Sequence, residues 1–225
     1  MSQIAIAENK LDAARKHLNS EYNLLKTMDC PERLSKHYSN YSTLYNFLNK
    51  QDSAVYVSLL GLEAAEAAKD TLTQIRLGCN IGAFFDQMGQ FDQVLKYELK
   101  ALKLAKRHND PYSKAMVFTQ ISGTYLEQFN KTGKKEYLKR SLETAQEGLK
   151  NANIVQQLPL ALDAYNVISK AFGIKKEYSR SIAYADSILL NTPRGMDLFN
   201  RNLQEAFLRK SEAYYALGKY QLAKS

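Results

Sequence analysis

An internal repeat limits what this chain can fold into more than any other feature of its sequence. A large apolar or aromatic residue, a small residue directly after it and an aromatic residue three positions further recur together. The set occurs at Tyr41-Ser42-x-x-Tyr45, Ile81-Gly82-x-x-Phe85, Ile121-Ser122-x-x-Tyr125 and Ile168-Ser169-x-x-Phe172. The leading residues are 40, 40 and 47 positions apart. A period of this length predicts stacked copies of one supersecondary unit rather than one globular core.

The composition predicts that each copy is helical. Glycine (10) and proline (4) are scarce among the 225 residues, while 45% are hydrophobic and 24% are charged. Ala, Leu, Lys and Gln are abundant, and their side chains lose little rotamer freedom in a helix. Each copy therefore reads as a pair of helices, in which the small residue allows close approach and the aromatic fills the space toward the neighbouring copy. One pair cannot bury its apolar face alone, so at least three must stack.

Signals for helix starts agree with this register. Asp110-Pro111 places a capping side chain before a proline at the first helical position. Thr71-x-x-Gln74 matches a capping box, which predicts that Thr71 caps a helix. Pro31, Pro159 and Pro193 fall near the expected turns between copies, where a missing backbone donor costs nothing.

These signals divide the chain into one array with a partial copy at each end. The boundaries are a partial repeat 1–30, full repeats of about 31–70, 71–109, 110–154 and 155–194, and a partial repeat 195–225. The 47-residue interval contains a seven-residue insertion near Asn130 to Glu136, which we expect to form a loop between two helices. Because both end copies look cut, we expect the chain to be an excerpt of a longer protein.

No arrangement of residues indicates catalysis, a cofactor or a metal site. The sequence lacks GxGxxG, GxxxxGK[ST], HExxH and GxSxG motifs. His17, His37 and His108 are scattered, and the two cysteines, Cys30 and Cys79, match no zinc motif and do not make a disulfide framework. We therefore expect a protein that is not an enzyme.

The repeat resembles that of the tetratricopeptide (TPR) family. The clearest copy adds Gly89-x-Phe91, Val94 and Ala101-Leu102, which is similar to the family's turn glycine, aromatic and small second-helix residues. The 40-residue period resembles the long-helix variety known in kinesin light chains and bacterial signalling regulators. The resemblance implies an all-α, right-handed superhelical solenoid of antiparallel helix pairs, with about four full repeats, that binds proteins rather than catalysing a reaction.

The resemblance also implies where a ligand binds. In the family, the second, sixth and ninth positions of each first helix face a concave groove that holds a peptide. Read onto this chain, these residues are Lys36, Asn40, Arg76, Asn80, Gln120, Asn166, Lys170 and Arg209. Two cation–amide pairs one turn apart, Lys36 with Asn40 and Arg76 with Asn80, resemble part of the carboxylate clamp of chaperone-binding members. Met116 and Gln120 stand where that clamp needs basic residues, and a plain polar groove wall remains the alternative.

Basic residues give a second candidate surface. The net charge is +8, and Lys96, Lys100, Lys103 and Arg107 share one face of a second helix. Binding of nucleic acid or another anionic partner is one interpretation. We prefer a solvated convex face, because aromatic residues are not interleaved with these charges and packing already explains the Tyr and Phe positions of the array. Another basic cluster, Lys131, Lys134, Lys135, Lys139 and Arg140, lies in and after the insertion and could be a contact site or a plain loop.

The sequence therefore predicts a protein- or peptide-binding module of a larger, bacterial signalling protein. The alternatives are a cytoplasmic peptide-sensing regulator and a structural adaptor. A periplasmic sensor segment and a cytoplasmic location both remain open. No apolar stretch is long enough to span a bilayer, so we expect membrane contact only through segments outside this chain.

Overall fold

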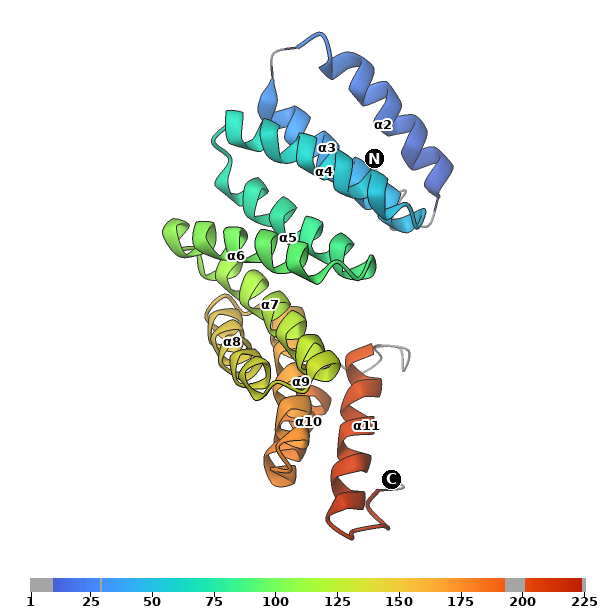
Figure 1. The fold of residues 1–225 in the computed structure, drawn as a ribbon. Helices are drawn as coiled ribbons and strands as arrows, with labels where there is room; N and C mark the ends of the chain where they lie inside the picture. Colours follow the sequence, from blue (N-terminus) through green and yellow to red (C-terminus); the bar gives the residue numbers. More distant parts are fainter. Residues whose placement is uncertain (1–9, 29, 193–200, 224–225) are drawn as a thin grey trace. The chain divides into compact units, whose positions relative to one another are not determined.

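The computed structural model describes residues 10–28, 30–192 and 201–223, and within these ranges it contains ten α-helices and no strand (Figure 1). The helices are α2 (Leu11–Leu25), α3 (Pro31–Phe47), α4 (Gln51–Ala67), α5 (Thr71–Gln87), α6 (Phe91–His108), α7 (Pro111–Thr132), α8 (Lys135–Ile154), α9 (Leu158–Ile174), α10 (Tyr178–Asn191) and α11 (Arg201–Ala216). The prediction of an all-α fold is confirmed.

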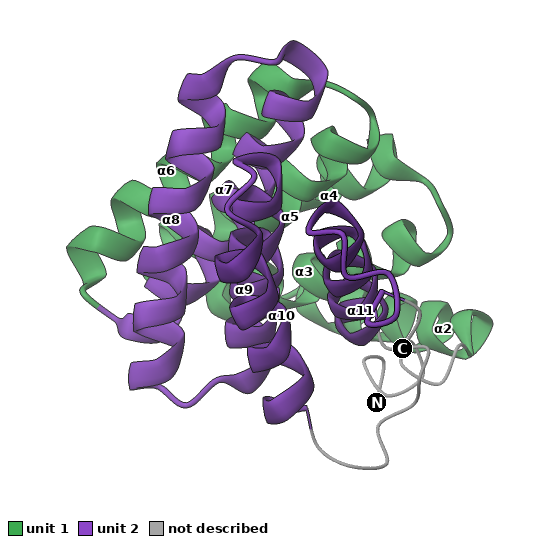
Figure 2. Cartoon of the chain, turned by 90° about the horizontal axis from the view of Figure 1, so that it is seen from below, with its two compact units in different colours: residues 1–109 green, residues 110–225 purple. Residues whose placement is uncertain are grey.

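The chain divides into two compact units, residues 1–109 and 110–225, which Figure 2 shows in different colours. In the first unit, α3 packs on α4, α4 on α5 and α5 on α6, while α2 packs on α3. In the second unit, α7 packs on α8, α8 on α9 and α9 on α10, and α11 packs on both α9 and α10. Within each unit, consecutive elements are therefore neighbours in space, as in a repeat whose helix pairs stack in chain order.

The repeated residues form the interior of each helix pair. Ile81, Ile121 and Ile168 are fully buried, and so are Ser122 and Ser169 directly after two of them. Short turns join the paired helices, and several of them contain a residue with left-handed backbone dihedrals, such as Gly89 with φ 72° between α5 and α6. Glycine adopts this conformation without steric cost, which accounts for its place in that turn.

The small residues bring paired helices into direct contact. Ser141 Oγ donates a hydrogen bond to the Ser122 carbonyl oxygen (2.8 Å), which joins α8 to α7. In the next pair, Ser169 Oγ donates to the Ser181 carbonyl (2.8 Å) and Ser181 Oγ donates back to the Ser169 carbonyl (2.8 Å). The buried hydroxyls are thus satisfied across the pair, as buried polar groups generally are.

One repeat has a different contact, because Gly82 and Val94 stand at the positions of the two serines, and Glu98, one turn after Val94, faces the glycine. A Cβ atom placed on Gly82 of α5 would lie 2.8 Å from Cγ of Glu98 on α6. Glu98 is 1% exposed, so its side chain occupies the space that a serine would need on α5. Gly82 is therefore required for close approach rather than for backbone flexibility.

The predicted helix starts are right in one case and wrong in another. The Asp110 carboxylate accepts from the Ser113 amide (2.7 Å), which confirms it as the cap of α7. The predicted Thr71–Gln74 capping box is wrong, because Asp70 caps α5 and accepts from the Thr73 amide (3.0 Å). A carboxylate one residue earlier is the better acceptor for the first-turn amides.

Pro31 and Pro159 lie in the first turns of α3 and α9, near the turns where the sequence placed them. Pro193 lies outside the described residues.

The insertion is helical, so the expectation of a loop near Asn130 to Glu136 is wrong. α7 continues to Thr132 and α8 begins at Lys135. Only two residues separate the helices, and the first, Gly133, ends α7 with a left-handed φ of 68°. The added residues lengthen both helices, because this segment has no breaker before Gly133 and each helix gains backbone hydrogen bonds by continuing.

Within the described ranges, no helix combines the length and the apolar character needed to cross a lipid bilayer.

Candidate functional site

In the first unit, the predicted cations of α3 and α5 lie close to one another. Lys36 and Arg76 are both exposed. Lys36 Nζ contacts Glu32 Oε1 at 2.6 Å, and this hydrogen bond is the main reason that the pKa of Lys36 is raised, while Arg76 acts in the opposite direction. The two first helices therefore place two positive charges within electrostatic reach of each other.

Asp70, at the start of α5, lies within electrostatic reach of both cations. Partial burial of its carboxyl group works against ionisation, but hydrogen bonds from Thr73 and the charges of Lys36 and Arg76 outweigh it and lower the pKa of Asp70. The carboxylate accepts from both the Thr73 amide and the Thr73 hydroxyl (2.7 Å). A first-helix face with two cations, a carboxylate and neighbouring amides can bind a polar ligand through charge-assisted hydrogen bonds.

The predicted amides follow one turn after the cations. Asn40 and Asn80 are half-buried, and they stand at the same register on α3 and α5. In the second unit, Gln120 of α7 has this register and is also half-buried. The three carboxamides thus recur at 40-residue intervals on first helices. Half-buried carboxamides can offer a donor and an acceptor to a ligand while their stems pack against the helices.

The second unit has a different arrangement on α9 and α11. Asn166 Nδ2 donates to Asn202 Oδ1 (2.8 Å), and Asn202 Nδ2 donates to Asp163 Oδ1 (2.9 Å). This chain of hydrogen bonds links α9 to α11 along one side of the pair. Lys170, the other predicted residue of α9, is half-buried one turn further.

Arg209 of α11 is engaged by two carboxylates of its own helix. Its guanidinium contacts Glu205 Oε2 at 3.3 Å and Glu212 Oε2 at 2.5 Å. The side chain is only 16% exposed, so its charge is neutralised and partly buried. Of the predicted cations, Arg209 is thus the one least available to a ligand.

The register identifies two residues of the second unit that the sequence reasoning missed. Counting back five positions from Ile81 gives Arg76, and counting back five from Ile168 gives Asp163 rather than Asn166. Counting back six from Ser211, the small residue of the last copy, gives Glu205. The same position is therefore cationic in the first unit and acidic on α9 and α11. Stricter alignment to the apolar and small landmarks would have identified both residues.

Cys79 does not face the predicted groove. It is 3% exposed, and burial, with a smaller contribution from Glu98 on α6, raises the pKa of its thiol. Cys79 is therefore a buried packing residue rather than a reactive thiol, because the thiolate is the reactive form.

The basic stripe on α6 is solvated. Lys96, Lys100, Lys103 and Arg107 are all exposed. An aromatic ring does lie among them, contrary to the expectation, because the Lys96 and Lys100 ammonium groups are 5.5 and 5.7 Å from the centroid of Tyr97. That ring also stacks on Phe85 of α5 (5.7 Å between centroids), so its position is explained by packing within the helix pair.

The basic cluster at the α7–α8 turn is exposed and partly neutralised. Lys131 pairs with Glu127 (2.9 Å) and Arg140 pairs with Glu136 (2.9 Å). Lys134, Lys135 and Lys139 are exposed beside them. The cluster thus lies at the end of a helix pair joined by a two-residue turn, and not in a long loop.

No three metal-ligating side chains gather anywhere in the described part of the chain.

Comparison with known proteins identifies the fold. No protein-family model matches the sequence, and no curated protein sequence is detectably similar to it. Among solved structures, BtubC (BKLC) from P. vanneervenii superposes with a TM-score of 0.78 at 16% identity, covering 96% of this chain and 86% of that one. The STAND protein PH0952 from Pyrococcus horikoshii, which has a tetratricopeptide repeat sensor, gives a TM-score of 0.77 at 13% identity, over 98% of this chain and 34% of that one.

A third structure, NprR in complex with its cognate peptide NprX, gives a TM-score of 0.65 at 13% identity, over 99% of this chain and 61% of that one. The chain therefore spans about a third of the length of PH0952 and less than two thirds of that of NprR. At these identities the likeness concerns the fold, and the fold is a helical repeat of the tetratricopeptide type.

Proposed function

We propose that this chain, a helical repeat of the tetratricopeptide type, binds a peptide or protein segment along the exposed faces of its first helices. The observation that carries the proposal is the repeated cation–amide pair of the first unit. Lys36 with Asn40 and Arg76 with Asn80 occupy the same register on α3 and α5, and the two cations lie within electrostatic reach of each other.

The burial of these side chains supports the proposal. Packing alone does not require a cation at this position, because Lys36 and Arg76 are both exposed and the equivalent residue of the second unit, Asp163, has the opposite charge. Exposed charged groups above half-buried carboxamides are suited to a polar, extended ligand, whose backbone offers donors and acceptors at regular intervals.

A displayed library of random linear peptides tests this function directly. We expect immobilised wild-type protein to enrich a family of peptides, and the double variant Arg76→Glu with Asn80→Ala to lose their capture. The control is a double variant with the same kinds of charge reversal and truncation on second helices, Lys100→Glu on α6 and Gln146→Ala on α8. This control should retain peptide capture. Circular dichroism should show equal helicity in all three proteins, because the substituted residues are not fully buried.

Enriched peptides that bind the Arg76 and Asn80 variant as well as the wild type would remove these residues from the site. Failure of the wild type to enrich any peptide would contradict peptide binding itself.

We further propose that the chain is the sensing or interaction segment of a larger regulatory protein. The support comes from the similar structures, since PH0952 has its tetratricopeptide repeats as a sensor and NprR is in complex with a peptide. The reading frame on either side of this segment tests the idea. An apolar span of about 20 residues next to it would favour a membrane sensor, and a helix-turn-helix module would favour a peptide-controlled regulator. A flank with neither would favour a structural adaptor.

A further inference from the structure

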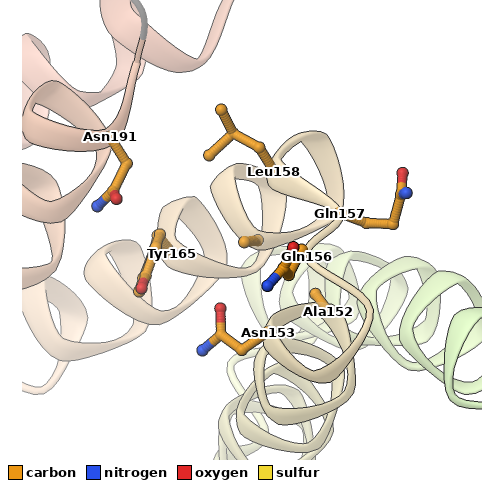
Figure 3. A pocket seen from close by; sticks show the side chains of 8 residues that line it. Ala152, Asn153, Gln156, Gln157, Leu158, Tyr165 and Asn191 are labelled. Atoms are coloured by element: carbon orange, nitrogen blue, oxygen red, sulfur yellow. The ribbon is translucent and has the colours of Figure 1, made fainter.

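A pocket in the second unit lies apart from the residues discussed so far. It encloses about 200 Å³ between the end of α8, the α8–α9 turn, the first turns of α9 and the last residue of α10 (Figure 3). On α9 it is lined by Leu158, Ala161 and Tyr165, which share one face of the helix. Asp163 of the first-helix face lies about half a turn away from these residues, and Asn166, which is offset from Tyr165 by about 100°, is not among the lining residues. The pocket is therefore a separate surface of the same helix.

None of the eight residues that line the pocket is charged. Its walls carry the carboxamides of Asn153, Gln156 and Asn191 and the phenol of Tyr165, and its floor includes Ala152 and Ala161, which are buried. In Figure 3 the side chains of Asn153 and Asn191 reach toward Tyr165 from α8 and α10. Donors and acceptors from three helices thus surround one small space without a formal charge.

The neutral lining sets this turn apart from the two preceding turns between repeats. The α4–α5 turn includes Glu66, Lys69 and Asp70, and the α6–α7 turn includes Lys106, Arg107, His108 and Asp110. The α8–α9 segment, residues 151–157, contains four carboxamides and no ionisable side chain. A surface turn has no structural need to lose its charges, since exposed charged residues are normal in such positions.

The start of α9 differs in the same way. Asp70 and Asp110 cap α5 and α7 with their carboxylates, but Gln157 precedes α9 and makes no capping hydrogen bond. The amides of Leu158 and Leu160 in the first turn of α9 therefore receive no capping side chain, while Pro159 has no amide hydrogen, and Leu158 lines the pocket. An acceptor on a ligand can satisfy them.

We propose that this pocket binds an asparagine or glutamine side chain of a partner polypeptide. A carboxamide presents both a donor and an acceptor, and it can therefore pair with the carboxamide walls in both directions. Asn191 Nδ2 already donates to the Ser187 carbonyl (2.7 Å), so this residue contributes its oxygen as an acceptor for the ligand's NH₂ group. The lining offers no counter-charge to a carboxylate or an ammonium group. The volume is below the range of pockets for drug-sized molecules and suits a single side chain.

Titration with small probes tests the assignment on the intact chain. The probes are N-acetyl-glutamine methylamide, its near-isostere N-acetyl-glutamate methylamide, and methyl glucoside as a neutral polyol. Nitrogen–proton NMR spectra follow the side-chain amide signals of Asn153, Gln156 and Asn191. We expect the glutamine probe to shift these signals saturably and to bind at least about threefold more tightly than the other two probes.

The variant Asn153→Leu keeps the size of the side chain but removes its hydrogen-bonding groups. Its affinity for the glutamine probe should fall about three- to tenfold, the effect of one hydrogen bond. Gln146→Leu makes the same kind of change at an exposed position of α8 outside the pocket and should leave the affinity unchanged. Unshifted signals, equal affinity for the glutamate probe, or preference for the glucoside would each overturn the proposal. Failure of peptide capture by the Arg76 variant would not affect it, because the two sites share no residue.

Discussion

The repeat formed by α5 and α6 and the repeat formed by α9 and α10 follow one register but fill it differently. In the interior, Gly82 faces Glu98 in the first of these, while Ser169 and Ser181 exchange hydrogen bonds in the second. At the position of Ser181, α6 has Val94, and Glu98 one turn later fills the space that Gly82 leaves. The register therefore specifies how closely the paired helices approach, while the side chains that make the contact can vary if the residues on both helices change together.

The same two repeats also differ at their first-helix faces and helix starts. Arg76 stands where the later repeat has Asp163, and α5 has an aspartate cap where α9 has Gln157. Arg76, Asp163 and Gln157 are exposed, so packing does not restrict them. Differences between repeats at such positions are therefore where recognition can be specified.

Among these substitutions, Gly82→Ser should have the largest effect on the free energy of unfolding. The added Cβ would meet Glu98 Cγ at 2.8 Å, and we expect the free energy of unfolding to fall by about 2 kcal/mol, as for other overpacked cores. Combining it with Glu98→Ser removes the side-chain atoms that the new Cβ would meet and should restore most of that loss. Urea unfolding at pH 7 of the four proteins in this double-mutant cycle measures the coupling.

Gly123→Ser in α7 is the matched control for the cycle, because nothing lies within 4 Å of a Cβ at that glycine. It should be neutral or stabilising by about 0.5 kcal/mol through helix propensity. Equal effects of the two single substitutions would show that Glu98 does not fill the space at Gly82.

The helix caps give an intermediate effect. Asp70→Ala should lower the free energy of unfolding by about 1 kcal/mol, and Gln157→Asp should raise it by about 0.5 to 1 kcal/mol by giving α9 the cap it lacks. The pKa of Asp70 is lowered in the folded protein from its unfolded value of about 3.9. The contribution of its carboxylate is therefore present above that value and is lost as the pH falls through the folded pKa.

Urea unfolding of wild type and Asp70→Ala at several pH values between 7 and 3 checks this dependence. The difference between the two proteins should shrink toward the acid end of the series. A difference that grows as the pH falls would contradict the capping role.

The smallest effects on stability are expected at the first-helix faces. Arg76→Glu and Asp163→Arg should each change the free energy of unfolding by no more than about 0.5 kcal/mol, because both side chains are exposed. Asp163 should lie nearer the upper end, since it accepts a hydrogen bond from Asn202. Thermal unfolding measures both values. A loss above about 1 kcal/mol would mean that the residue supports the fold, which would weaken its use in recognition.

The apolar and small positions of the repeat could be predicted from the sequence because burial leaves few alternatives there. Ile81, Ile121 and Ile168 are fully buried as their spacing indicates. The insertion could not be placed, because a seven-residue addition can become a loop or extend two helices, and a single left-handed Gly133 decides between these outcomes. The pKa of Cys79 is raised mainly by burial and further by Glu98 on the next helix, and no pattern within α5 reveals that neighbour.

The register of the candidate site residues could be followed along the sequence only where the repeats keep equal length. Lys36, Asn40, Arg76, Asn80 and Gln120 follow the 40-residue interval. After the insertion this interval no longer applies, so the prediction named Asn166, whereas Asp163 is the residue of α9 that corresponds to Arg76. The pocket at the α8–α9 turn was not predicted, because carboxamides in a turn have no distinctive spacing and only the folded chain brings Asn191 beside them.

The reciprocal bonds between Ser169 and Ser181 have a mechanical consequence. Each hydroxyl donates to the other residue's carbonyl, so the two hydrogen bonds together fix the offset of α9 and α10 along their axes. Sliding by one turn would leave both hydroxyls buried without partners, at a cost of about 1 to 3 kcal/mol each. Under tension along the chain, these directional hydrogen bonds oppose sliding of α9 along α10. The contact of Gly82 with Glu98 opposes sliding of α5 along α6 through steric fit alone.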